Sequence, residues 1–210
     1  MKNTKKLLAA LLVAGALVSC GGEGTSTPED KPTAGEVVNR TELEASLVGV
    51  AQNKTVYLTT VGQADSDIVG NVFKKAGATG SYTVSTMLKA SEVAEGSVVF
   101  LTLGSSSKGL GAAGVDEAFE KNRAKEFADA AKAGKITLVL FHVGGTARRG
   151  TSSDPIIEAA FPGAKACFLV ESGNADGFFT NLASTNSVSL YSVAKALDLV
   201  DFSKGLFGLN

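Results

Sequence analysis

The sequence contains no tryptophan, a single histidine and only two cysteines, and neither sign of charge dominates it. Its 210 residues include 20 Lys and Arg against 21 Asp and Glu, which gives a formal net charge of -1 at pH 7. Nucleic acids and acidic membrane surfaces usually require a basic face on the protein, so this balance predicts no nucleic-acid partner. Aromatic side chains make up 7% of the chain, which leaves few groups for stacking on bases or sugars.

The shortage of histidine and cysteine also limits metal chemistry. No spacing of these residues matches a zinc site, and we predict no metal centre. A harder cation would require four carboxylates to converge in the fold, namely Asp65, Asp154, Glu171 and Asp176. The second cysteine, Cys167, lies in the apolar run 166–170 and is expected to be a small buried side chain. No motif identifies a cofactor.

The N-terminal segment has the features of an export signal. Three lysines precede an apolar run, residues 7–18, that is too short to span a bilayer. The run leads into Leu17-Val18-Ser19-Cys20-Gly21, which resembles the bacterial lipoprotein signal, in which the cysteine is diacylated and becomes the mature N-terminus. The resemblance implies a signal peptide over residues 1–19 and a lipid anchor on Cys20. Acyl chains there would attach the protein to the cell membrane or outer membrane on its extracytoplasmic side.

Composition divides the rest of the chain into three parts. Residues 20–35, which begin with the lipidated cysteine, are rich in Gly, Ser, Thr and Pro and are predicted to be a flexible tether. Residues 36–53 have modest apolar spacing and form a lead-in segment, for which a short docking helix is one option. Residues 54–210 are predicted to be a single α/β domain.

Short apolar runs alternate with helical patterns along this domain, which is typical of parallel strands joined by crossover helices. The predicted strands are 55–61, 82–87, 97–103, 136–141, 165–170 and 188–191, and the predicted helices are 67–75, 116–133, 154–160, 175–183 and 193–200. The helix over 116–133 is expected to bury Ala118, Phe119, Phe127, Ala130 and Ala131 and to expose Glu117, Glu120, Lys121, Arg123 and Lys125. The pattern predicts an α/β fold, a three-layer, doubly wound, mostly parallel sheet of about five to six strands, flavodoxin-like or Rossmann-like.

The most informative stretch is residues 97–154, where two apolar strands each end in a glycine-rich polar loop, 104–114 and 142–154. Ligands of open parallel sheets bind at the carboxyl ends of the strands, and polar residues gather after four of the predicted strands. We therefore predict a site for a small anionic or polar ligand at this edge. The candidate ligand-binding residues are Gln63, Ser105, Ser106, Ser107, Lys108, Arg148, Arg149, Asp154, Glu171, Asn174 and Asp176.

The first glycine-rich loop matches no familiar catalytic or nucleotide motif. Lys108 precedes Gly109, whereas the nucleotide P-loop has Gly-Lys-Ser/Thr directly before a helix. The glycines of Gly109-Leu110-Gly111-Ala112-Ala113-Gly114 have the spacing of a dinucleotide fingerprint, but they come late in a long loop and lack an acidic partner on the next strand. The G-x-S-x-G elbow of serine hydrolases is missing too, because Gly104 has no second glycine at the required place. An anion-binding loop and a purely structural loop both stay open.

Two positions in the second loop allow both a functional and a structural interpretation. His142, the single histidine, ends a strand beside two glycines, where it could act as a general base or as a hydrogen-bonded scaffold residue. Arg148 and Arg149 suit a bidentate clamp on a carboxylate or phosphate. Alternatively, an arginine pairs with Asp154 or Glu120 to pin the loops, and we expect one of the two arginines to do so.

Several segments carry a resemblance to a bacterial domain family. They are Tyr57-Leu-Thr-Thr-Val-Gly-Gln63, Gly104-Ser-Ser-Ser-Lys-Gly-Leu-Gly-Ala-Ala-Gly114, Glu120-Lys-Asn-Arg123, His142-Val-Gly-Gly-Thr-Ala-Arg-Arg-Gly150 with Ser153-Asp154, and Asn174-Ala-Asp-Gly-Phe-Phe179. Together they resemble an uncharacterised domain family of exported proteins and lipoproteins, over about residues 54–203. The resemblance implies an exported α/β domain and assigns no catalytic residue.

Three functions fit the sequence. The first is a lipid-anchored extracytoplasmic protein that binds a small anionic or polar ligand at the strand ends. The second is a hydrolase or transferase that uses His142 as general base, with Lys108 and Arg148 stabilising negative charge. The third is a surface scaffold without catalysis.

Overall fold

The computed structural model describes residues 39–209. The predicted signal peptide, the predicted lipidation of Cys20, the tether and the first three residues of the lead-in lie outside the described residues. Among the helices of residues 39–209, none is both long enough and apolar enough to cross a membrane.

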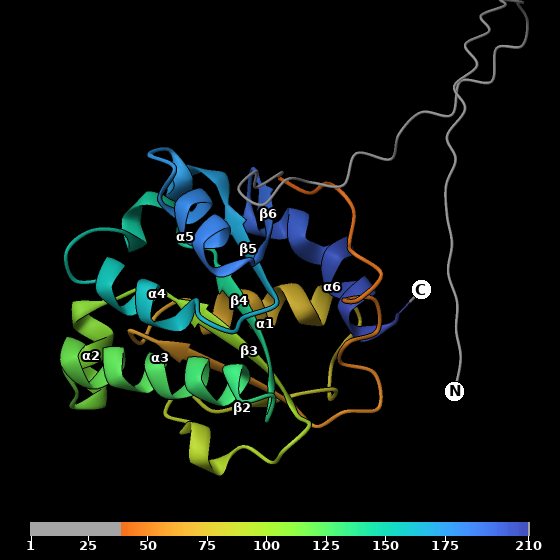
Figure 1. Cartoon of the computed structure of the whole chain (residues 1–210), viewed down its shortest axis with the longest axis horizontal. Helices are drawn as coiled ribbons and strands as arrows, with labels where there is room; N and C mark the ends of the chain where they lie inside the picture. The colour runs from red at the N-terminus through yellow and green to blue at the C-terminus, as the bar shows by residue number, and fades with distance from the viewer. Residues whose placement is uncertain (1–38, 210) are drawn as a thin grey trace, which may run out of the picture. The chain divides into compact units, whose positions relative to one another are not determined.

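The domain is built on one sheet of six strands that all run parallel (Figure 1). The strands are β1 (Val56–Val61), β2 (Thr83–Val84), β3 (Val98–Leu103), β4 (Thr137–His142), β5 (Ala166–Val170) and β6 (Ser189–Val193). They lie in the order β2-β1-β3-β4-β5-β6. The chain therefore moves outward from β1 in one direction and from β3 in the other. The prediction of a doubly wound, parallel α/β fold is confirmed.

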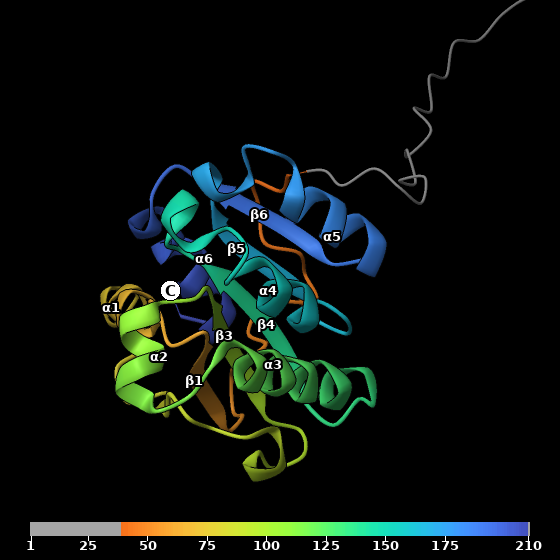
Figure 2. The same ribbon diagram turned by 90° about the vertical axis from the view of Figure 1, so that its left-hand side faces the viewer.

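Helices cover both faces of the sheet because its strands are apolar on both sides. The helices are α1 (Ser66–Lys75), α2 (Ser107–Ala113), α3 (Glu117–Lys132), α4 (Asp154–Ala160), α5 (Phe178–Asn186) and α6 (Val200–Phe207). On β3, Val99 and Leu101 pack under α3, α4 and α5, whereas Val98 and Phe100 pack under α1 and α6. Figures 1 and 2 show the two layers of helices on opposite sides of the sheet.

The lead-in packs against the domain and contributes to its core. Leu47 and Ala51 are buried in the layer that contains α6. The amide of Gly49 donates to the carbonyl of Gly205, at 2.7 Å. Asn39 forms a parallel bridge with Leu190 of β6, so the lead-in also covers part of the outer edge of the sheet.

The structure corrects the predicted loop over residues 104–114, because residues 107–113 form the helix α2. The side chain of Ser106 caps this helix by accepting from the amide of Gly109, at 3.2 Å, and Gly114 ends it in a left-handed conformation. Glycines at 109 and 111 lower helix propensity, which is why the sequence pattern indicated a loop.

Two further predictions about helices were wrong. The predicted helix 193–200 is replaced by the end of β6, a short 3-10 turn, η4 (Ala196–Leu199), and the start of α6 at Val200. On α3, Glu120 and Arg123 are buried rather than exposed, and Phe119 is 40% exposed. The buried pair faces the loop that follows β1, and it forms hydrogen bonds with backbone groups there.

Candidate functional site

The carboxyl ends of β1 and β3 lie side by side, and the loops that follow these strands meet there. The connections from these two neighbouring strands leave toward opposite ends of the sheet, and ligands of doubly wound folds bind at such a switch point. Residues 62–65 and 104–106 form these two loops and pack directly on each other, since the amide of Ser106 donates to the carbonyl of Gly62 at 2.9 Å. We refer to this switch-point region at the ends of the two strands as the β1/β3 crevice.

The loop after β1 has an unusual concentration of left-handed backbone. Gly62, Gln63 and Asp65 have φ angles of 90°, 58° and 62°. For a side-chain-bearing residue this conformation costs about 1 kcal/mol or more, so surrounding contacts must hold it. The strained turn directs Gln63 and Asp65 toward separate partners on α3 and on the loop after β4.

Glu120 and Arg123 brace this turn from inside the protein. Their side chains are 0% and 2% exposed, and they form an ion pair at 3.0 Å. Glu120 accepts from the amide of Gly62 and from the side-chain amide of Gln63, each at 2.9 Å. Arg123 donates to the backbone carbonyls of residues 60, 86 and 88. The side-chain amide of Gln63, a predicted ligand residue, is therefore occupied by a hydrogen bond within the protein.

Arg148 lies over the opposite side of the crevice. It ends the 3-10 turn η2 (Gly145–Arg148), and its Nε donates to the two carboxylate oxygens of Asp65 at 3.2 and 3.3 Å. Its stem fits against Gly104 and Gly144, where a methyl group on either glycine would overlap it. Within residues 39–209, Nη1 and Nη2 of Arg148 have no acceptor, and the side chain is 32% exposed. Arg148 thus offers four N–H donors at the β1/β3 crevice.

The start of α1 adds two further donors beside Asp65. This residue occupies the N-cap position, but its carboxylate makes no capping bond and pairs with Arg148 instead. The amides of Ser66 and Asp67 consequently have no acceptor within the described part of the chain.

Arg149 has a different environment although it follows Arg148 directly. Its Nε and Nη2 pair with Asp154, at 2.8 and 3.2 Å, and Nη1 and Nη2 reach Asp176, at 3.1 and 3.0 Å. Nη1 also donates to the carbonyl of Gly173, and the guanidinium stacks on Phe178 at 3.9 Å. All of its donors are therefore in use. Hydrogen bonds from Arg149 lower the pKa of Asp176 to about 2.

The contacts of Arg149 with Asp154, Asp176 and Gly173 join the loops after β4 and β5, which enclose a small hollow of about 290 Å³. Its walls include Thr146 and Ser172 besides the arginine and its two carboxylates. Asn174 belongs to the scaffold, because its side-chain oxygen accepts from the amides of Phe179 and Thr180 at the start of α5. Glu171 points into solvent at the beginning of the 3-10 turn η3 (Glu171–Asn174).

His142 lies behind the crevice and is 0% exposed. Its Nδ1 is 3.1 Å from the carbonyl oxygen of Leu103, and its Nε2 is 3.1 Å from that of Gly145. Burial lowers its pKa, against a smaller opposing effect of the two backbone carbonyls. Gly173 packs directly on the ring. A substrate has no path to either ring nitrogen, so the geometry supports the scaffold interpretation of His142.

The four polar residues 105–108 separate into inner and outer positions. The amide of Ser105 donates to Ser153 Oγ at 2.8 Å, while Ser105 Oγ is buried without a partner among the described residues. Ser106 is the cap of α2, as described above. Ser107 and Lys108 are exposed on the first turn of α2.

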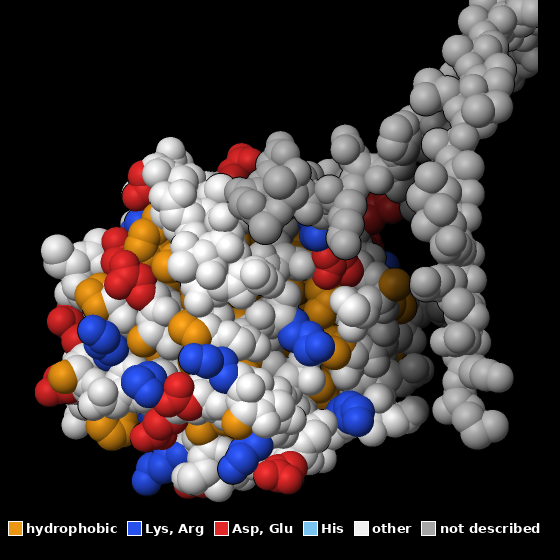
Figure 3. Space-filling model, viewed as in Figure 1, with side chains coloured by type: hydrophobic (Ala, Val, Ile, Leu, Met, Phe, Trp, Pro, Cys, Tyr) orange, Lys and Arg blue, Asp and Glu red, His pale blue; other side chains and the backbone are white. Residues whose placement is uncertain are grey.

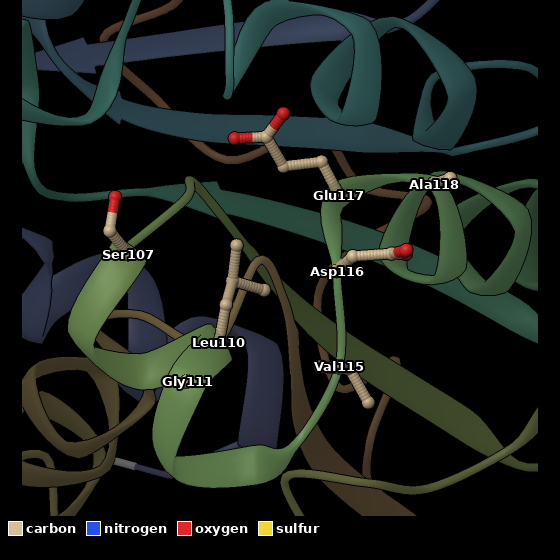
Figure 4. A pocket seen from close by; sticks show the side chains of 7 residues that line it. All are labelled: Ser107, Leu110, Gly111, Val115, Asp116, Glu117 and Ala118. Atoms are coloured by element: carbon tan, nitrogen blue, oxygen red, sulfur yellow. The ribbon is translucent and has the colours of Figure 1, made fainter.

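A second hollow, of about 490 Å³, separates α2 from the start of α3. Ser107 and Glu117 point toward the same side of it and Leu110 lies between the two helices (Figure 4). Gly111 also lines this hollow, and the space where its side chain would be is open.

The described residues do not form a metal-binding cluster of three or more His, Cys, Asp or Glu side chains. The four carboxylates considered for a cation are instead dispersed: Asp65 faces Arg148, Asp154 and Asp176 face Arg149, and Glu171 faces solvent. On the face shown in Figure 3, acidic and basic side chains are interspersed and form no extended patch of one sign.

Sequence reasoning missed the residues that hold the site together. Glu120 and Arg123 were assigned to a solvated face, because their spacing on a charged helix is the usual spacing of exposed pairs. Ser153, which anchors the amide of Ser105, gave no signal beyond its place in a polar loop. Asp65 was considered only as part of a cation site.

These features define a doubly wound α/β domain that gathers polar side chains at its switch point. Residues 53–207 match the model of a domain of unknown function, DUF6305. The match covers most of the chain, and the protein belongs to this family. Comparisons with curated proteins and with solved structures gave no match.

Proposed function

We propose that this protein is a lipid-anchored extracytoplasmic protein that binds a small anionic or polar ligand at the β1/β3 crevice. The observation that carries the proposal is the state of Arg148. Its orientation is fixed by Asp65 and by two glycines, yet four of its donors face no acceptor among the described residues. A guanidinium that is held in place and keeps donors without a protein acceptor is a ready recognition group for oxygen atoms of a ligand.

The other arginine supports the same assignment by contrast. Arg149 has all of its donors satisfied and joins two loops, so Arg148 is the one of these two arginines that is available to a ligand. Strain in the turn 62–65 points to the same place, since strained backbone that the fold maintains tends to occur at functional sites.

Catalysis with His142 as general base has less support. Both ring nitrogens face backbone carbonyls, and the ring is buried between Gly173 and Phe179. A scaffold without a ligand stays the competing function, because ion pairs around Arg149 brace the loops whether or not anything binds.

A ligand screen distinguishes binding from the scaffold. The full-length protein, purified in a mild non-ionic detergent, is melted by circular dichroism with carboxylic acids, phosphorylated metabolites, amino acids, polyols and nucleotides. A ligand that binds only the folded state raises the melting temperature. We expect a shift that disappears in Arg148→Ala and persists in Lys121→Ala, a change at an exposed position on α3. If no compound shifts the melting temperature, the scaffold is favoured.

The membrane anchor has a separate test. If Cys20 carries the lipid, metabolic labelling with a palmitate analogue will mark the wild-type protein, and Cys20→Ser will abolish the label and move the protein to the soluble fraction. Label that persists in this variant would contradict the anchor.

A further inference from the structure

The geometry around Arg148 also indicates the chemical class of the ligand, an inference that rests on the proposed function. Asp65 occupies only the Nε side of the guanidinium. Nη1 and Nη2 have no acceptor among the described residues, in a side chain that is 32% exposed, and their N–H groups are spaced for two oxygens of one planar group. A carboxylate matches this edge with two parallel hydrogen bonds.

The local charge limits how negative the ligand can be. Arg148 is already paired with Asp65, and Asp67 adds another negative charge in the first turn of α1. Lys108 on α2 precedes Gly109, which packs on Gln63 in the turn after β1, and it has no acidic partner within residues 39–209. The set Arg148, Lys108, Asp65 and Asp67 sums to zero formal charge. A single carboxylate adds one negative charge and gains a guanidinium partner, whereas a phosphate dianion would add two without a second free arginine.

The surroundings of the guanidinium favour a ligand that is recognised by hydrogen bonds. The first-turn amides of Ser66 and Asp67 are free donors, and they come from the turn that holds Asp65. Ser105 Oγ, in the loop against which Arg148 packs, is buried and has no partner among the described residues. Buried polar atoms without partners are rare, and a bound molecule is one explanation for them.

We propose that the β1/β3 crevice binds a small monocarboxylate, held end-on by the Nη1–Nη2 edge of Arg148. Asp65 orients the guanidinium through Nε and does not touch the ligand in this arrangement. The Arg149 cluster does not take part in binding.

Calorimetric titration of the full-length protein tests this class directly. The probes are acetate, propionate and butyrate, the three corresponding amides, and inorganic phosphate, all at equal ionic strength. We expect at least one carboxylate to bind about tenfold or more tightly than its amide, because the amide loses one charge-assisted hydrogen bond. Arg148→Lys, which keeps the charge but removes the planar edge, should weaken binding by about tenfold, and Lys121→Ala should leave it unchanged.

The outcomes separate this inference from the proposed function. Phosphate that binds more tightly than every carboxylate, or amides that bind as well as carboxylates, would overturn the monocarboxylate class. If that binding is still lost in Arg148→Ala, the crevice stays a binding site for another kind of ligand. Equal carboxylate affinity in the wild type and in Arg148→Lys would overturn the end-on geometry. Absence of binding by every probe here and by every compound in the wider screen would overturn both.

Discussion

Two glycine-to-alanine changes test whether Arg148 is seated as the structure shows. Gly144 has φ -84° and ψ -2°, which alanine adopts without strain. A methyl group there would nevertheless overlap Arg148 Cγ and Asp65 Oδ2. Gly111, in α2, is the matched control, because a methyl group at this position meets no atom within 4 Å. Both changes add the same group, and only the first one disturbs the crevice.

The expected effects on stability have opposite signs. Gly144→Ala forces a crowded methyl group into the crevice, which typically costs about 1–3 kcal/mol. It also separates a partly exposed ion pair, and such a pair contributes about 0.2–1 kcal/mol. Gly111→Ala replaces a glycine in a helix at an open position and should stabilise the protein by about 0.5–1 kcal/mol. The two variants should therefore differ by about 2–5 kcal/mol in the free energy of unfolding.

Urea unfolding followed by circular dichroism at 222 nm measures this difference, since the chain has no tryptophan to report by fluorescence. The slope of the transition should be similar in both variants. Ligand binding should be lost in Gly144→Ala and retained in Gly111→Ala. If Gly144→Ala is as stable as the wild type and still binds ligand, Arg148 is not held over Gly144 and does not form the binding site.

Three further predictions concern buried groups. Glu120→Ala leaves Arg123 charged and buried without its partner, so we expect a loss of about 3–5 kcal/mol in urea unfolding, against a small effect of Glu117→Ala on the exposed side of the same helix. Burial lowers the pKa of His142 from 6.5, so the unfolded chain takes up a proton there before the folded chain does. The free energy of unfolding should therefore fall as the pH decreases below about 6.5. Comparing the wild type with His142→Gln across pH 5–7 isolates this contribution. If the two plots of unfolding free energy against pH are parallel, the prediction is refuted. Burial also raises the pKa of Cys167, and mass spectrometry should find this cysteine unmodified by thiol reagents until urea unfolds the domain.

Much of the fold was predictable because its strands are buried on both faces. A strand such as β3 is apolar along its whole length, and β4 and β5 have the same character, so alternation with helices indicated a parallel sheet. The order of the strands was not predictable in this way. It depends on which neighbour each crossover reaches, and the sequence of an isolated strand contains no information about that.

The helices were less predictable where their residues serve the site. Helix α2 has two glycines, and one of them, Gly109, is required because a side chain there would overlap the carbonyl oxygen of Gln63. That contact joins α2 to the turn after β1, so the glycine that weakens the local helix signal has a tertiary reason. The burial of Glu120 could not be predicted for a similar reason, since its partners on the turn are backbone and amide groups far away in the sequence.

The two arginines show most clearly where sequence reasoning ends. Arg148 and Arg149 are adjacent, identical in chemistry and followed by the same polar loop, and the sequence predicted only that one would be structural. The backbone separates them: Arg148 closes the turn η2, whereas Arg149 is extended, with φ -115° and ψ 170°. This change in direction sends one guanidinium toward Asp65 and the other toward Asp154 and Asp176. The number of carboxylates that each side chain meets then decides its role, because two carboxylates and a carbonyl satisfy Arg149 completely while a single carboxylate leaves most of Arg148 free.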